Sequence, residues 1–264
     1  MTALLVYAAC GLAAGILAGL LGVGGGIVVV PMLVFIFAWQ GVPAELIQLM
    51  ALGTSLGTIV ITSVASFRAH DKRGAVRWDI WRAVTPCILI GTFGGGFAAK
   101  AMPTFFLTVF FICFVYCISV QMFLDLKPKG SRHLPGALGM HGAGGVIGVV
   151  SSLVGIGGGS LSVPFMAYCN VPMHTAVGTS AAIGFPIAAA GTVSYIWNGL
   201  SVPNLPPYSL GYVNLTALAG IAAVSYFTAP LGAKLAHSLP VGKLKRFFAV
   251  FLFCIATRML WTVL

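Results

Sequence analysis

Long apolar runs separated by short polar segments dominate the chain, and their lengths predict its architecture. A helix that spans lipid needs about 20 apolar residues. Eight runs are of that order: roughly 3–21, 45–67, 79–101, 104–125, 137–154, 173–197, 210–233 and 243–263. Two shorter runs, 26–38 and 159–169, would reach only about 15–20 Å as helices. The pattern predicts an all-α integral membrane protein with about eight long transmembrane helices and two short half-helix arms.

Each short arm follows a glycine cluster, and the two clusters are copies of one pattern. Gly22-Val23-Gly24-Gly25-Gly26 is followed by an apolar run and Pro31; Gly155-Ile156-Gly157-Gly158-Gly159 is followed by an apolar run and Pro164. The second cluster comes 133 residues after the first. A glycine cluster at the end of an apolar run predicts a broken helix followed by a short arm.

Two further matches turn this resemblance into an internal repeat. Gly53-Thr54-Ser55 recurs as Gly178-Thr179-Ser180, and Ala99-Lys100 recurs as Ala233-Lys234. Three matches in the same order indicate two related halves. We therefore predict a first repeat over 1–126, a polar cytoplasmic linker over 127–136 and a second repeat over 137–264.

Composition supports a lipid environment. Hydrophobic residues make up 59% of the 264 residues and charged residues only 7%, whereas a soluble domain carries about 25%. No Asp, Glu, Lys or Arg lies between Arg132 and Lys234. The net charge of +10 would suggest nucleic acid in a soluble protein, but here the basic residues lie between helices. We expect a multi-pass protein of the bacterial inner membrane that binds no nucleic acid.

The basic segments also predict an orientation. Lys and Arg gather in 68–82, 126–136 and 234–246, and the loop 198–209 carries no charge. Four simple crossings in each half would place the basic segment 234–246 outside and the uncharged loop 198–209 inside, which violates the positive-inside rule. If each glycine-broken segment and its arm instead form a hairpin or two crossings, all three basic segments face the cytoplasm. The charge pattern favours this second arrangement, in which the halves are inverted.

The glycine clusters are candidate binding sites for an anion. A broken helix frees backbone N–H groups that lipid cannot satisfy, and the positive end of a helix dipole suits an anion. The candidate substrate-binding glycines are Gly24, Gly25, Gly26, Gly157, Gly158 and Gly159. Close helix packing through glycine is the alternative explanation, and the recurrence at matched positions favours a site near the midplane between the repeats.

Hydroxyl and basic side chains complete the candidate set. Thr54, Ser55, Thr179 and Ser180 are candidate donors to the anion, although such hydroxyls can also bond back to their own helix. Lys100 and Lys234 are candidate contacts at the two mouths of a pathway, although each can extend to the interface instead. His70 and His174 are weaker pathway candidates, and either can be a solvated or paired histidine.

Several classes of protein find no support. The carboxylates are only Glu45, Asp71, Asp79 and Asp125, all at predicted helix ends or loops, so a buried carboxylate proton relay is poorly supported. The six cysteines form no C-x-x-C pair, and no catalytic motif is present. We expect a protein that is not an enzyme and that needs neither a metal nor a cofactor.

The doubled Gly-x-Gly-Gly-Gly with its Pro, the doubled Gly-Thr-Ser and the loop that carries His70, Gly74, Val76 and Trp78 together resemble the sulfite exporter TauE/SafE family. The resemblance covers nearly the whole chain. It implies a polytopic inner-membrane carrier, commonly with eight spanning segments, for sulfite, sulfoacetate or related small anions. The resulting hypothesis is an exporter of a small oxyanion. The rival hypothesis is a membrane scaffold or assembly protein whose glycines only pack helices.

Overall fold

The structure is a computed structural model with ten helices and one small hairpin in its described residues, 2–21, 25–124, 133–238 and 241–263. Side chains are described in 5–16, 25–124, 133–228 and 246–262. The first half contains α1 Thr2–Leu21, α2 Gly26–Trp39, α3 Ala44–Asp71, α4 Trp78–Ala101 and α5 Thr104–Phe123. The second contains α6 Ala137–Val154, α7 Gly159–Tyr168, α8 Met173–Gly199, β1 Ser209–Leu210, β2 Val213–Asn214, α9 Leu215–Ser238 and α10 Val241–Val263.

The helices begin and end within a few residues of the predicted runs, with one exception. Helix α9 starts at Leu215 instead of residue 210, because a two-stranded antiparallel hairpin pairs Ser209 with Asn214. Three prolines in 203–207 disfavour helix in the approach to this hairpin. Gly211 has a φ of +56° at the hairpin turn, a conformation that glycine adopts freely.

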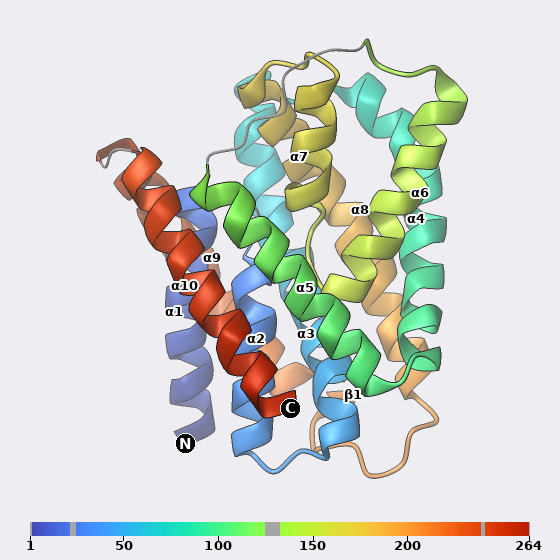
Figure 1. The fold of residues 1–264 in the computed structure, drawn as a ribbon, viewed down its shortest axis with the longest axis vertical. Helices are drawn as coiled ribbons and strands as arrows, with labels where there is room; N and C mark the ends of the chain where they lie inside the picture. The colour runs from blue at the N-terminus through green and yellow to red at the C-terminus, as the bar shows by residue number, and fades with distance from the viewer. Residues whose placement is uncertain (1, 22–24, 125–132, 239–240, 264) are drawn as a thin grey trace.

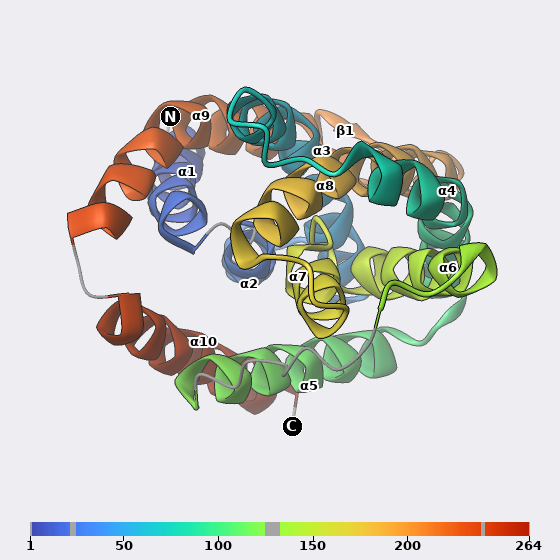
Figure 2. The same cartoon turned by 90° about the horizontal axis from the view of Figure 1, so that it is seen from above.

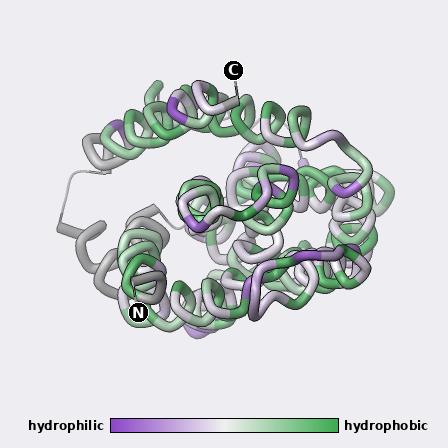
Figure 3. Tube along the Cα trace, turned by 90° about the horizontal axis from the view of Figure 1, so that it is seen from below, coloured by the Kyte–Doolittle hydropathy of each residue, from purple (hydrophilic) through white to green (hydrophobic). Residues whose placement is uncertain are grey.

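The described helices include five that are long and apolar enough to cross a membrane: α3, α4, α5, α6 and α8. Apolar residues predominate along the helices of the outer ring (Figure 3). These features agree with an all-α membrane protein. Spanning by the other three long helices, α1, α9 and α10, stays a prediction.

The two short arms, α2 and α7, run back toward the end from which their hairpins start (Figure 1). Helix α1 rises from the N-terminus at the lower end and α2 descends again, whereas α6 descends from the upper end and α7 rises. The C-terminal ends of α3, α7 and α9 therefore lie at the top of the bundle, and the C-terminal ends of α4 and α8 lie at the bottom.

The packing contacts repeat with the halves exchanged. Helix α1 packs on α9 while α6 packs on α4; α2 packs on α3 while α7 packs on α8; and α3 contacts α9 while α4 contacts α8. Helices α3 and α8 also pack on each other, as do α5 and α10. Seen from above, α2 and α7 lie inside a ring of the other helices (Figure 2). The contacts between the halves therefore meet at the middle of the bundle, where the glycine clusters lie.

Proline in α8 creates one of these contacts. Pro186 lies inside the helix and has no N–H to donate to the Ala182 carbonyl one turn earlier. The Trp81 indole of α4 donates to that carbonyl at 3.1 Å. The freed backbone group thus becomes a contact between the two halves.

Candidate functional site

The second glycine break, residues 155–159, has a conformation that requires glycine. Gly155 ends α6 with a φ of +69°, and Gly158 precedes α7 with a φ of +75°. Both are left-handed conformations that side chains with a Cβ rarely adopt. The Ile156 amide returns to the Ser151 carbonyl at 3.1 Å, which closes the end of α6. The backbone can then leave α6 and enter α7 within a few residues.

Helix α7 begins at this break with free backbone donors. The amides of Leu161 and Ser162 donate to the Gly158 carbonyl at 3.0 and 2.8 Å. Across the described residues, the amides of Gly158, Gly159 and Ser160 have no backbone partner. The first amides of a helix lack partners inside it and carry the positive end of its dipole. The break therefore presents several N–H groups and a partial positive charge inside the bundle.

Buried hydroxyls of Ser151 and Ser160 lie beside these amides, and a third, that of Ser152, lies on the side of α6 that packs against Gly95 of α4. Ser151 and Ser152 are fully buried in α6, and Ser160, in the first turn of α7, is 8% exposed. None of the three hydroxyls has a hydrogen-bond partner among the residues whose side chains are described. The Ser151 hydroxyl lies 3.6 Å from the position that a Cβ would take at Gly158. Buried polar groups in proteins are nearly always paired, so this cluster is chemically unusual.

Paired hydroxyls support the same break. The Ser162 hydroxyl lies 2.9 Å from the Gly158 carbonyl and 2.8 Å from the Ser180 hydroxyl oxygen. The Ser55 hydroxyl of α3 donates to the Gly155 carbonyl at 2.8 Å. Two of the predicted residues, Ser55 and Ser180, are thus brought to the break, where they hold its backbone in place.

The two glycine breaks meet in the middle of the bundle. A Cβ at Gly26, the first residue of α2, would lie 2.7 Å from the Gly155 carbonyl oxygen. A Cβ at Gly184 of α8 would lie 3.0 Å from the Gly157 carbonyl oxygen. Such short separations show that backbone packs directly on backbone here. Gly26 of the first break therefore lies against Gly155 and Ile156 of the second break, and a single site between the halves stays a prediction.

The two threonines of the Gly-Thr-Ser motifs have a different role. The Thr54 hydroxyl oxygen accepts the Asn214 amide at 3.0 Å, and the Thr179 hydroxyl oxygen accepts the Arg77 amide at 2.9 Å. The preceding Gly53 lies against the Tyr212 carbonyl, just as Gly178 does against that of Ala75. We call these two contacts the Gly-Thr clamps. Each clamp joins the segment before α4 or α9 of one half to the long central helix of the other half.

The first glycine break, residues 22–26, is described only from Gly25 onward, so the predicted Gly24 lies outside the described residues. Gly25 repeats the hydrogen bonding of Gly158, because its carbonyl accepts the amides of Val28 and Val29 at 3.1 and 3.0 Å. Its φ of −56° is an ordinary helical value. The first turn of α2 is wholly apolar, so this break shares the carbonyl hydrogen bonding of the second break but neither its left-handed glycine nor its hydroxyls.

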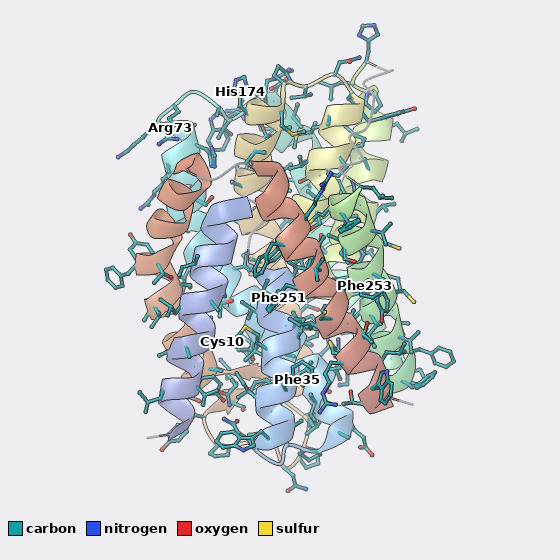
Figure 4. The ribbon with its side chains drawn as sticks, turned by 60° about the vertical axis from the view of Figure 1, so that its left-hand side comes forward. Cys10, Phe35, Arg73, His174, Phe251 and Phe253 are labelled. Carbon is teal, nitrogen blue, oxygen red and sulfur yellow. The ribbon has the colours of Figure 1, made fainter. Side chains whose placement is uncertain are left out.

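The basic candidates lie at the ends of the bundle. Lys100 donates to the Asn198 carbonyl at 2.8 Å, where α4 and α8 end together. The Lys234 side chain is outside the described residues. His174 is exposed beside Thr175, with 3.1 Å between ring nitrogen and hydroxyl. His174 and Arg73 both lie at the upper end (Figure 4). His70 is half-buried in the last turn of α3. The three of these side chains that the structure describes, those of Lys100, His174 and His70, lie at helix ends and not at the glycine breaks.

An ion pair between Arg77 and Asp79 lies at the start of α4, at the upper end of the bundle. The Arg77 guanidinium donates from Nε to the Asp79 carboxylate at 2.9 Å and also contacts it through Nη2. These bonds raise the pKa of Arg77, so its charge is kept at any physiological pH. No group of three or more His, Cys, Asp or Glu side chains that could hold a metal ion occurs in the described ranges.

Sequence reasoning missed Ser151, Ser152 and Ser160. A signal for them was present, because the aligned positions in the first half are Ala18, Gly19 and Ile27. At these aligned positions, only the second repeat carries hydroxyl side chains near its glycine cluster. Comparison of the repeats position by position, rather than motif by motif, would have found them.

The apolar bundle, its internal repeat and its buried hydroxyl-lined break are features of a multi-pass membrane transporter. A "Probable membrane transporter protein" of Haemophilus influenzae is 38% identical over 263 residues, covering 98% of each chain. The "Probable membrane transporter protein YunE" of Bacillus subtilis is 31% identical over 209 residues, covering 72% of this chain and 77% of that protein. No solved structure matches.

Residues 7–259 match the family described as "Sulfite exporter TauE/SafE". The chain belongs to this family. It is therefore a multi-pass protein of the cell membrane in a family of transporters, which are not in general enzymes. The resemblance inferred from the doubled glycine motif is confirmed.

Proposed function

We propose that this chain exports a small oxyanion, such as sulfite, sulfoacetate or a related sulfur-containing or organic anion, bound at the second glycine break. One observation carries the proposal. The free amides at the start of α7 lie beside the buried, unpartnered hydroxyls of Ser151 and Ser160. Helix N-termini bind anions, and hydrogen bonds to a charged group are stronger than those between neutral groups.

The proposed site uses backbone and hydroxyl donors together. The amides of Gly158, Gly159 and Ser160 and the hydroxyls of Ser151 and Ser160 donate to the oxygens of the anion, and Gly157 leaves room for it beside the backbone. Gly26 approaches from the first half, so the two breaks enclose the site near the midplane. No Asp or Glu occurs anywhere in the second half to repel the anion. Ser55 and Ser180 keep the break in shape, and the clamps of Thr54 and Thr179 join the halves around it.

Packing alone explains the glycines of this arrangement but not its hydroxyls. Close contact accounts for Gly26, Gly53 and Gly178, which meet backbone of the other half. It does not account for hydroxyls left unpaired in an apolar interior, where an unsatisfied polar group is costly. A bound oxyanion supplies the missing acceptor atoms. For this reason we favour the transporter over a scaffold whose glycines only pack helices.

The distribution of charge supports the direction of transport. The described basic side chains Arg68, Lys72, Arg73, Arg77 and Arg82 lie at or near the junction of α3 and α4, at the upper end of Figure 1. The positive-inside rule assigns this end to the cytoplasm and makes the halves an inverted repeat. A positive field at the cytoplasmic mouth concentrates anions there, and the uncharged loop at the other end does not retain them.

Flux measurements test the proposal. Purified protein in proteoliposomes is loaded with sulfite, thiosulfate, sulfoacetate or lactate, and the release of each anion is followed. We expect release of at least one sulfur oxyanion well above the rate of empty liposomes, with inhibition by excess of the same anion. Release no faster than from empty liposomes for every member of the panel would reject the transporter proposal and favour the scaffold.

A further inference from the structure

A buried glutamine lies on the same helix as Ser55, the residue whose hydroxyl bonds to the second glycine break. Gln48 of α3 is 2% exposed, and neither its amide nitrogen nor its amide oxygen has a hydrogen-bond partner in the described part of the chain. A primary amide has two donors and an acceptor, and burying such a group unpaired is costly. Polar residues inside a membrane bundle commonly mark the path of a substrate.

Helix geometry places Gln48 on the side of α3 that faces the second break. Leu52 of this helix lies against Gly155, and Ser55 donates to the Gly155 carbonyl. Residues four and seven apart share one face of an α-helix, so Gln48 shares the face of Leu52 and Ser55. At 1.5 Å per residue it lies about 10 Å from Ser55 along the helix axis. Because α3 rises in Figure 1, Gln48 is on the lower side of the break, the side on which Glu45, Lys100 and the uncharged loop 198–209 also lie.

The helices around the second break and the middle of α3 carry no charged side chain. The stretch from 133 to 233, which includes α6, α7 and α8, contains no Asp, Glu, Lys or Arg. Helix α3 carries such residues only near its ends, Glu45 at one end and Arg68 and Asp71 at the other. The electrostatic support for an anion is therefore the dipole of α7, equivalent to roughly half an elementary charge, and a set of neutral donors.

We propose that the transported species is a singly charged, proton-bearing oxyanion of the hydrogen sulfite type, and that Gln48 is a specificity-determining contact below the glycine break. This inference rests on the proposed function. The Born cost of desolvation grows with the square of the charge, so a dianion costs about four times as much to bury as a monoanion. A site with half a positive charge and neutral donors compensates one negative charge far better than two.

Gln48 fits such a species because its amide can donate and accept at once. The Nε2 group donates to an unprotonated oxygen of the anion, and Oε1 accepts the proton of the protonated one. A fully deprotonated oxyanion has no donor for Oε1. The glutamine therefore favours the proton-bearing form in addition to the preference set by charge.

Binding at two pH values tests the inference. The affinities of the purified full chain for sulfite, sulfate and methanesulfonate are measured by titration calorimetry at about pH 6 and about pH 8, on either side of the second ionisation of sulfite. Methanesulfonate is a permanent monoanion and so controls for changes in the protein itself. We expect apparent sulfite affinity to fall about tenfold per pH unit above that ionisation, methanesulfonate binding to stay constant and sulfate not to bind.

The variant Gln48→Met keeps the length of the side chain and removes both polar atoms, and Gln121→Met on α5 is its matched control. We expect Gln48→Met to weaken sulfite binding at the lower pH by about tenfold or more while methanesulfonate loses less, and Gln121→Met to change neither. Sulfite affinity that holds or rises with pH, sulfate binding as tight as sulfite, or an unchanged Gln48→Met would overturn the inference while leaving the transporter proposal standing. No binding of any anion at either pH would overturn both.

Discussion

The two glycine breaks share one backbone design and differ in chemistry. In each, a glycine carbonyl accepts the amides of residues three and four further on: Gly25 in the first break, Gly158 in the second. Gly158 has a left-handed backbone and buried serines beside it, whereas Gly25 is helical and is followed by apolar residues only.

From this difference we infer that the repeat supplies the scaffold and that the second half supplies the proposed site. Both breaks are needed to bring backbone from the two halves together, as Gly26 and Gly155 show. Only the second break adds hydroxyl donors to the free amides. A pseudo-symmetric fold can thus hold a single asymmetric binding site between its halves.

The largest expected difference between the breaks is in stability. Gly158→Ala forces a Cβ onto a left-handed residue, which costs about 1–2 kcal/mol, and drives the new methyl into the Ile187 side chain. Gly25→Ala meets a helical φ of −56°, so no conformational penalty arises. We expect a clear fall in the melting temperature of the detergent-solubilised protein for Gly158→Ala and little change for Gly25→Ala. Equal melting temperatures would show that the two breaks are not conformationally different.

Substitution of the threonine should lower the melting temperature by a similar amount in the two Gly-Thr clamps, whereas substitution of the glycine should affect the two breaks differently. Thr54→Val and Thr179→Val keep the shape of the side chain and remove the acceptor for the Asn214 or Arg77 amide. Leaving a buried donor unsatisfied costs about 1–3 kcal/mol, so thermal melting should show similar losses in both variants. If one variant is neutral, only the other clamp joins the halves.

Ser55→Ala tests whether this hydroxyl shapes the break or binds the anion. It removes the bond to the Gly155 carbonyl, a net loss of about 1 kcal/mol. We expect a small decrease in melting temperature, with anion affinity changed in proportion to the distortion and therefore less than in variants of Ser151 and Ser160. A loss of affinity larger than theirs, at unchanged stability, would assign Ser55 to the anion itself.

The smallest effect is expected at the end of the bundle. Lys100→Met removes a part-buried contact with the Asn198 carbonyl; because the lysine itself is exposed, we expect the loss to be about 1 kcal/mol or less. Transport and melting temperature should both remain close to those of the parent. A strong loss of flux with normal stability would restore Lys100 to the pathway.

The orientation of the halves is tested separately by cysteine labelling. In a background without the six native cysteines, Ser201→Cys and Ala69→Cys are exposed to an impermeant thiol reagent in intact cells. We expect labelling from outside at residue 201 and none at residue 69, because we propose that the basic loops face the cytoplasm. The reverse pattern would reject the proposed direction of the electrostatic field and of export.

The helices were predictable because a lipid bilayer requires apolar runs of a certain length. Each glycine cluster also marked the end of one apolar run. The hairpin before α9 was not, since it depends on a short turn at Gly211 and on its contact with α8, where the Tyr212 amide donates to the Tyr195 carbonyl at 3.3 Å. The glycine motif identified the neighbourhood of the candidate site. It did not distinguish the role of the threonine from that of the serine in Gly-Thr-Ser, because the hydrogen-bond partner of Thr54 lies 160 residues away in the sequence.

The most direct test of the account is the anion affinity of a Ser151→Ala, Ser160→Ala double variant, measured by calorimetry with sulfite at about pH 6, where the proton-bearing form prevails. Ser63→Ala is the matched control, because its buried hydroxyl bonds only to its own helix at Val60. The account predicts a loss of about tenfold or more for each lost charge-assisted bond, at undiminished melting temperature because neither hydroxyl has a partner in the described protein. Parent-like affinity in the double variant would contradict the placement of the anion at the second glycine break.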